Sequence, residues 1–218
     1  FGYYVFLHLK NERMIFYFTG TGNSRWVAGA LGTAFDEPLV SIDDELNDGK
    51  DENVYPLRER EKVFFVFPVH SWGPAVLVSR FISRLILSGY KGQEVYFVCT
   101  CGDDCGYTDR IMRSTLARRG ITLTGGFSIQ MPNNYILMPG FDVDSKEVET
   151  EKLKKAPERV DEIVEAIRQK KNPSLYCAGS APLLKSYMVY PLFTHFAIGS
   201  NRFYACLLYT SDAADDGE

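Results

Sequence analysis

A short apolar run that leads directly into a glycine loop sets the strongest limit on the fold of this chain. Residues Met14–Thr19 are apolar, aromatic or β-branched without polar alternation, which is typical of a strand buried on both faces. The loop Gly20–Asn23 follows, and Ser24–Phe35 then carries apolar residues at helical spacing. A buried strand, a tight loop and an amphipathic helix in this order predict a parallel sheet wrapped by helices.

The same alternation continues along most of the chain. Four more strands are expected, at Leu39–Ile42, Lys62–Phe67, Glu94–Thr100 and Phe127–Met131. Further helices are expected at Pro74–Leu87, Asp109–Arg119 and Ser145–Lys171. Gly120 would cap the second of these, and Pro157 would kink the third or start its second half. We therefore predict one doubly wound α/β domain over residues 14–171, with a five-stranded parallel sheet in three α/β/α layers.

The two ends of the chain are expected to differ from this domain. Residues 172–205 are interrupted by prolines and contain the helix-compatible stretch Leu183–Phe196, which indicates a helical extension or linker. Phe1–Arg13 precedes the first plausible initiator, Met14. Cys206–Glu218 resembles the translation of a transposon-type sequencing adapter, with an ordinary acidic tail as the alternative. We expect residues 1–13 and 206–218 to be non-native or disordered.

Charge and cysteine content narrow the class of protein. The chain of 218 residues has 24 Lys and Arg against 28 Asp and Glu, so its net charge of -4 leaves no surplus of cations for a nucleic acid backbone. Its apolar runs are shorter than the ~20 residues that span a bilayer. Five cysteines without even spacing favour reduced thiols. Together these features predict a soluble cytoplasmic protein that does not bind nucleic acid.

The loop after the first strand has the composition of a phosphate-binding loop. Its residues are Thr19, Gly20, Thr21, Gly22, Asn23 and Ser24. The two glycines allow close approach of the backbone to a ligand, and hydroxyls and N–H groups converge at a helix N-terminus. The loop has no terminal Lys-Ser/Thr pair, and Arg25 stands where a dinucleotide fingerprint needs glycine. The alternative is a strand-to-helix turn that needs glycine for its geometry alone.

Two further strand ends carry loops suited to a flat ligand. The first contains Pro68, Val69, His70, Ser71, Trp72 and Gly73, and it presents an indole at the mouth of the sheet. The second runs from Thr100 through Cys101, Gly102 and Asp103 to Tyr107. In an open α/β sheet, ligands bind at the carboxyl ends of the strands. The alternative for Trp72 is simple packing against a neighbouring helix.

These loops carry a resemblance to a known family. Ile15–Ser24 resembles the flavodoxin signature. Together with Pro68–Pro74, Thr100–Tyr107 and Met131–Tyr135, it is similar to the flavodoxin half of the flavodoxin-ferredoxin fusion proteins of anaerobic bacteria. The resemblance covers about Met14 to Ala205. Flavodoxins usually carry Thr where this chain has Ser24, and the hydroxyl is retained.

The resemblance implies a bound FMN and assigns roles to the loop residues. Thr19, Thr21, Asn23 and Ser24 would bind the phosphate, with Gly20 and Gly22 shaping the loop. Trp72 and Tyr107 would enclose the isoalloxazine. Backbone groups of the two later loops would contact the polar edge of the ring, namely those of His70, Ser71, Cys101, Gly102 and Asp103. The rest of the site would be formed by Pro68, Val69, Gly73 and Thr100. Asn134 and Tyr135 are a weaker assignment, because this loop could equally serve a partner interface.

The function implied by the resemblance is electron transfer by FMN. The partner would be a redox protein or a fused ferredoxin domain, and a [4Fe–4S] cluster would lie only in a missing C-terminal segment, if at all. The three loops hold no cationic side chain, which would favour a low flavin potential. The alternatives are an FMN-dependent quinone or NAD(P)H reductase, a flavodoxin-like protoporphyrinogen oxidase, and an interaction module that has lost flavin.

Other chemistry-bearing residues receive weaker predictions. Cys99, Cys101 and Cys105 lack the C-x-x-C spacing of common metal sites, and Cys99 should point into the sheet. We therefore predict no metal site and no catalytic residue. His70 could give a proton to a reduced flavin, although a binding-loop histidine is more often a hydrogen-bond donor. Asp43–Glu45 is expected to be a solvated acidic turn rather than a ribose-binding site.

Overall fold

A central parallel sheet organises the structure. The computed structural model describes residues 14–59, 61–133, 143–171 and 175–197. Within them, five parallel strands run in the spatial order β2, β1, β4, β7, β8, with bounds Leu39–Ser41, Met14–Tyr17, Val63–His70, Val95–Cys101 and Gly125–Gln130. Relabelled by their order in the chain, these strands lie in the order 2-1-3-4-5, which is the flavodoxin-like arrangement. The predicted doubly wound α/β fold is confirmed.

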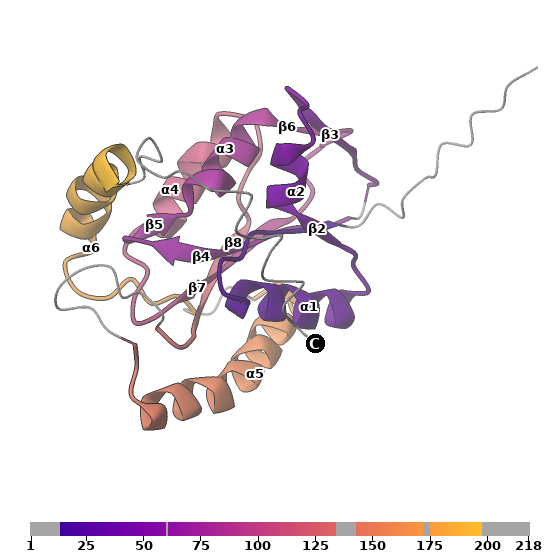
Figure 1. The fold of residues 1–218 in the computed structure, drawn as a ribbon. Coiled ribbons are helices and arrows are strands. Elements are labelled where there is room, and N and C mark those ends of the chain that lie inside the picture. Colours follow the sequence, from indigo (N-terminus) through magenta and orange to yellow (C-terminus); the bar gives the residue numbers. More distant parts are fainter. Residues whose placement is uncertain (1–13, 60, 134–142, 172–174, 198–218) are drawn as a thin grey trace, which may run out of the picture.

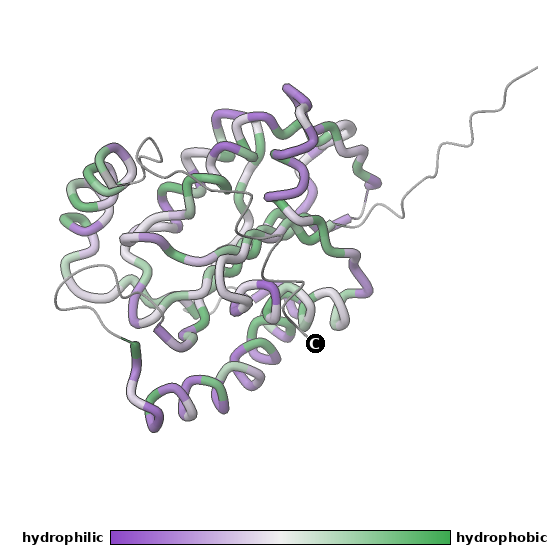
Figure 2. Tube along the Cα trace, in the orientation of Figure 1, coloured by the Kyte–Doolittle hydropathy of each residue, from purple (hydrophilic) through white to green (hydrophobic). Residues whose placement is uncertain are grey.

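Helices cover both faces of this sheet, as Figure 1 shows. Helices α1 (Asn23–Phe35) and α5 (Lys146–Arg168) pack on one face. Helices α2 (Ile42–Asn47), α3 (Val76–Arg84) and α4 (Thr108–Ala117) contribute to the core on the other face. Figure 2 shows hydrophilic and hydrophobic residues alternating along α5, as expected for a helix with one buried face.

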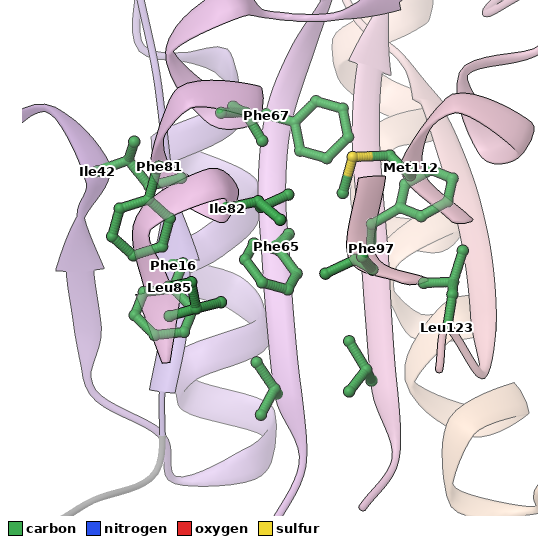
Figure 3. Packing of buried hydrophobic residues seen from close by; sticks show 14 of the residues in the cluster. Phe16, Ile42, Phe65, Phe67, Phe81, Ile82, Leu85, Phe97, Met112 and Leu123 are labelled. Carbon is green, nitrogen blue, oxygen red and sulfur yellow. The ribbon is translucent and has the colours of Figure 1, made fainter. Parts of the chain in front are cut away.

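Strand β4 is buried on both faces, which explains why its sequence is apolar without alternation. Phe65 and Phe67 enter the core beneath α3 and α4, whereas Phe64 and Val66 enter the core beneath α1 and α5. Figure 3 shows the first of these cores, where the ring of Phe16 lies 5.4 Å from that of Phe65 and 5.0 Å from that of Phe81. Burying an aromatic side chain of this size contributes about 1.5–3 kcal/mol to stability. The central strands are therefore held from both sides.

The predicted helix Pro74–Leu87 was wrong at both ends. Gly73–Pro74 forms β5, which pairs antiparallel with the end of β4, and α3 begins only at Val76. At the other end, Leu85–Ser88 forms β6, which pairs in parallel with β3 (Asn53–Pro56). Leu85 and Leu87 still reach the core, so the apolar positions fit both a helix and a strand. The distant partner strand β3 decided the outcome.

The acidic run Asp43–Glu45 was expected to be a solvated turn, and Asp43 and Asp44 are indeed exposed. The run differs from the prediction only in being helical, because it forms the first turn of α2. The Ser41 side chain accepts a hydrogen bond from the Asp44 N–H at 3.3 Å, which caps the helix, and acidic residues in a first turn favour the helix dipole. Gly120 follows α4 with a φ of 71°, as expected of a residue that ends a helix. Pro157 was expected to kink the last helix or to start its second half, but α5 passes through it as one element.

The chain ends in a helical segment that alternates between α and π turns. Its parts are α6 (Pro182–Leu184), η1 (Lys185–Val189), α7 (Tyr190–Leu192) and η2 (Phe193–Ala197), and we call residues 182–197 the C-terminal helical segment. It agrees with the predicted stretch Leu183–Phe196. The predictions for residues 1–13, for Asn134 and Tyr135, and for residues 198–218 lie outside the described residues. Among the described helices, none is both long and apolar enough to cross a membrane.

Candidate functional site

The strand order brings the three loops singled out by the sequence to one edge of the sheet. Strands β1, β4 and β7 are adjacent and parallel, so their carboxyl ends meet there. We call the connections after them the Thr19 loop (residues 19–24), the Trp72 loop (residues 68–74) and the Tyr107 loop (residues 100–107). The strand order reverses between β1 and β4, and this is where open α/β sheets bind ligands.

The Thr19 loop leaves the start of α1 open. Gly22 precedes the helix with a φ of 100°, which favours glycine, and its N–H donates to Thr19 Oγ1 at 3.1 Å. No side chain caps α1, and its first turn holds no acidic residue. A Cβ atom built on Gly20 or Gly22 would meet no atom within 4 Å, so open space borders the loop. An anion that enters this space meets the positive end of the helix dipole.

The other helix starts among α1–α5 are less suited to an anion. Ser41 caps α2 and Ser145 caps α5, and both first turns are acidic. Helix α4 carries Asp109 in its first turn. Helix α3 is uncapped, but Ala75 before it is only 1% exposed. Helix α1 therefore offers the accessible and electrostatically favourable site.

Two of the predicted phosphate-binding side chains also hold the loop in place. The Ser24 hydroxyl is buried and lies 2.8 Å from Thr100 Oγ1, so it links α1 to the end of β7. The side-chain amide of Asn23 donates to the Pro132 carbonyl at 3.3 Å. The exposed residues of this loop are Gly20, Thr21 and Gly22, directly before the helix. Thr100, predicted as a ligand-binding residue, is thus a buried anchor of the Thr19 loop.

The Trp72 loop is a tight hairpin in an unfavourable backbone conformation. Val69 and His70 pair with Pro74 and Gly73, so the turn consists of Ser71 and Trp72. Both residues have a positive φ, 47° and 65°. A two-residue hairpin turn requires such angles, but they are costly for residues other than glycine, by about 1–3 kcal/mol each. Backbone strain of this kind concentrates at functional sites, and here it coincides with the predicted ring-binding indole.

The Tyr107 loop lies against the Trp72 loop. A Cβ atom on Gly106 would lie 2.9 Å from Trp72 Cβ, so only glycine permits this approach. The Arg110 guanidinium lies 3.8 Å from the centre of the Tyr107 ring and covers one of its faces. Asp103 is exposed, and its carbonyl accepts from the Gln130 side chain at 2.8 Å. The two loops therefore pack against each other, and each carries a half-buried aromatic side chain.

The cysteines near this site are buried and protonated. Cys99, Cys101 and Cys105 lie in the core, and the sulfur atoms of Cys99 and Cys105 are 3.5 Å apart. Burial raises the pKa of Cys99, and a hydrogen bond with Cys105 together with burial raises that of Cys101. Buried thiols with a raised pKa are poor nucleophiles. Within the described parts of the chain, no group of three or more His, Cys, Asp or Glu side chains is arranged to hold a metal ion.

His70 is neutral at physiological pH. Burial lowers the pKa of its imidazole from the ordinary value of 6.5. The ring of Phe18, directly after β1, lies edge-on to the imidazole with the ring centres 6.3 Å apart. A neutral imidazole has one N–H donor and one acceptor, so His70 is suited to a hydrogen bond rather than to charge compensation.

Sequence reasoning missed the cations that reach the two aromatic loops from other segments. Lys185 Nζ lies 2.6 Å from Asp104 Oδ2 and 5.1 Å from the centre of the Trp72 ring. Lys152 of α5 lies 3.7 Å from Asp103. The prediction of a low flavin potential considered only the residues of the three loops, whereas these lysines approach from outside them. Nothing in the sequence around Lys185 indicated where it would dock.

Comparisons with known proteins give only distant likenesses. No family model matches the chain, and no curated protein matches it in sequence. Among solved structures, a Fusobacterium nucleatum flavodoxin bound to flavin mononucleotide is 11% identical, with a TM-score of 0.46 over 73% of this chain and 98% of that one. An azoreductase from Bacillus anthracis is 13% identical, with a TM-score of 0.40 over 69% and 99% of the two chains. The fold assignment rests on the strand order and the two-faced core described above.

Proposed function

We propose that this chain binds one FMN non-covalently and carries electrons to or from a redox protein. The observation that carries the proposal is the uncapped, acid-free start of α1 behind the Thr19 loop, at the point where the strand order reverses. A terminal phosphate fits the open space beside Gly20 and Gly22. The Trp72 and Tyr107 loops lie at the same edge and supply aromatic surface for a flat ring. When bound, FMN would supply the reversible electron storage.

This arrangement favours FMN over FAD. The Thr19 loop ends in one helix start, and Arg25 replaces the glycine that a dinucleotide fingerprint needs. The test is titration of the purified chain with FMN, FAD and riboflavin, followed by flavin fluorescence. We expect one FMN per chain and weaker binding of FAD. Absence of FMN binding, or equal affinity for FAD, would contradict the proposal.

A protein partner is supported by the surface beside the two aromatic loops. The C-terminal helical segment, which contacts both loops, exposes a row of large apolar side chains, seen as a largely hydrophobic stretch in Figure 2: Leu183, Leu184, Tyr187, Met188, Val189, Leu192 and Phe196. So many exposed apolar side chains on one short segment are typical of an interaction site. Its position next to the aromatic loops would bring a docked redox protein close to the flavin ring.

The partner and the enzymatic alternative can be separated by two rate measurements. A reduced bacterial two-cluster ferredoxin should reduce the FMN-loaded chain rapidly in a stopped-flow experiment, and Leu192→Glu should slow this reaction without changing FMN affinity. Oxidation of NAD(P)H in the presence of a quinone should be slow by comparison. Rapid NAD(P)H turnover with an inert ferredoxin reaction would instead favour the FMN-dependent reductase.

A further inference from the structure

The C-terminal helical segment reaches back across the sequence to join the Trp72 loop to the Tyr107 loop. The joining residue is Ser186, whose side chain is only 1% exposed. Its hydroxyl donates to the Trp72 carbonyl at 2.8 Å and accepts from the Tyr107 N–H at 2.7 Å. One side chain therefore bonds the backbones of both loops at the two aromatic positions.

These two backbone groups have no strand or helix partner to hold them. The Trp72 carbonyl belongs to a turn with two positive φ angles, and the Tyr107 N–H lies at the start of α4, where no side chain of that helix provides a cap. Leaving such groups buried without a partner costs about 1–3 kcal/mol each. A hydroxyl can donate one bond and accept another, so Ser186 satisfies both at once.

Two neighbouring contacts fasten the same segment on either side of Ser186. The Tyr190 hydroxyl donates to the Pro74 carbonyl at 2.8 Å, on the Trp72 loop. Lys185 pairs with Asp104 at 2.6 Å, on the Tyr107 loop, and both side chains of this pair are largely buried. The ring of Tyr187 also lies 6.2 Å from that of Tyr107. The segment is thus attached to each loop separately as well as through the shared bond.

We propose that the C-terminal helical segment is a clasp that sets the spacing of the two aromatic loops, with Ser186 as its positioning residue. This role rests on the proposed FMN site, because the clasp would hold the two loops that bind the flavin ring. The clasp contacts the Trp72 and Tyr107 loops and lies outside the Thr19 loop. Its loss should therefore weaken contacts to the flavin ring and leave contacts to the phosphate unchanged.

The test compares Ser186→Ala with Thr194→Ala. Thr194 lies in the same segment and is half-buried, and its hydroxyl donates to the Pro191 carbonyl within that segment at 3.0 Å rather than to either loop. Riboflavin has the ring of FMN without the phosphate. We expect Ser186→Ala to lower the affinity for FMN and for riboflavin by the same factor, about tenfold, as befits one lost pair of buried hydrogen bonds. Thr194→Ala should leave both affinities at the wild-type value.

A second measurement needs no flavin. Hydrogen exchange at the Tyr107 amide should accelerate in Ser186→Ala and not in Thr194→Ala, because Ser186 is the acceptor for this N–H. If Ser186→Ala fails to fold, Tyr190→Phe keeps the ring and removes the hydroxyl that bonds Pro74 and Ser79, and it should show the same equal loss of FMN and riboflavin affinity to a smaller extent.

The outcomes separate the clasp from the proposed function. If the wild-type chain binds FMN and Ser186→Ala matches Thr194→Ala in both affinities, the clasp is overturned while the FMN site stands. A loss of FMN affinity without a loss of riboflavin affinity also overturns it, because the effect then lies at the phosphate. If the wild-type chain binds neither flavin, the proposed function fails.

Discussion

Helices α1 and α5 both follow a strand of the main sheet at its carboxyl edge, yet their first turns differ in kind. The Ser145 side chain accepts from the Val148 N–H at 3.4 Å, and Glu147 and Glu149 add negative charge to the start of α5. Helix α1 has Gly22 in the capping position and no acidic residue in its first turn. A helix that caps itself gains stability, whereas an open start is available to a bound anion.

The largest effect is expected when negative charge is placed at the open start of α1, where the anion is expected to bind. We expect Thr19→Glu with Thr21→Glu to weaken FMN binding at least 100-fold, about 2.7 kcal/mol, through repulsion of the phosphate and filling of the open space. Flavin fluorescence titration measures the effect. Thr33→Glu with Thr150→Glu adds the same charge at exposed positions away from the loop and should bind FMN normally. Normal FMN binding by the first double variant would exclude the Thr19 loop as the phosphate site.

Replacement of Trp72 tests whether the ring is held by aromatic contact rather than by charge. Trp72→Ala should weaken binding of FMN by about 1 kcal/mol or more and shift the flavin potential. Trp72→Phe should retain most of the affinity, because it keeps an aromatic face at the same strained position. Redox titration and FMN titration of both variants give the result. Equal behaviour of the Ala variant and the wild type would show that Trp72 only packs.

Removing the Ser145 cap tests whether the start of α5 contributes to stability rather than to ligand binding. Ser145→Ala should lower the free energy of unfolding by about 1 kcal/mol, because the Val148 N–H loses its acceptor. Urea unfolding monitored by circular dichroism measures this. FMN affinity should not change, since α5 begins outside the three loops. A matching loss of FMN affinity would mean that the two helix starts are coupled.

A charge reversal at α1 should change stability and affinity in opposite directions. Arg25 lies exposed in the first turn of α1, and Arg25→Glu gives this helix the acidic turn that α2 and α5 already have. We expect a gain of about 0.5 kcal/mol in the stability of the flavin-free protein and a roughly fivefold loss of FMN affinity. Thermal unfolding with and without FMN separates the two. If stability and FMN affinity changed in the same direction, the start of α1 would not be the anion site.

The smallest effect is expected from pH at the Trp72 loop. Because burial lowers the pKa of His70 in the folded protein, the unfolded chain binds a proton more readily between that pKa and 6.5. Stability should therefore fall as the pH drops below about 6.5 and be fully present above it. His70→Gln should flatten this part of the pH–stability curve. An identical curve in the variant would assign the acid sensitivity to other groups.

Much of the site could be predicted because its signals are local. The Thr19 loop, Trp72 and Tyr107 each sit next to a recognisable buried strand, and parallel strands bring their carboxyl ends together without further information. The features that the sequence did not indicate depend on remote partners. Leu85–Ser88 became a strand because β3 pairs with it, and the Ser24 hydroxyl is bonded to Thr100, 76 positions away in the chain.

The sequence by itself determined the α/β fold, the two-sided burial of the central strands and the glycine-rich start of α1, because apolar spacing and backbone freedom act over a few residues. Tertiary structure alone decided which helix start stays open, that Ser71 and Trp72 share a strained turn, and that Ser186 joins Trp72 to Tyr107. Helical spacing identifies the segment around Ser186 as a helix but carries no information about where it docks. That position depends on hydrogen bonds and ion pairs between residues 79 to 116 positions apart, which form only when the whole chain has folded.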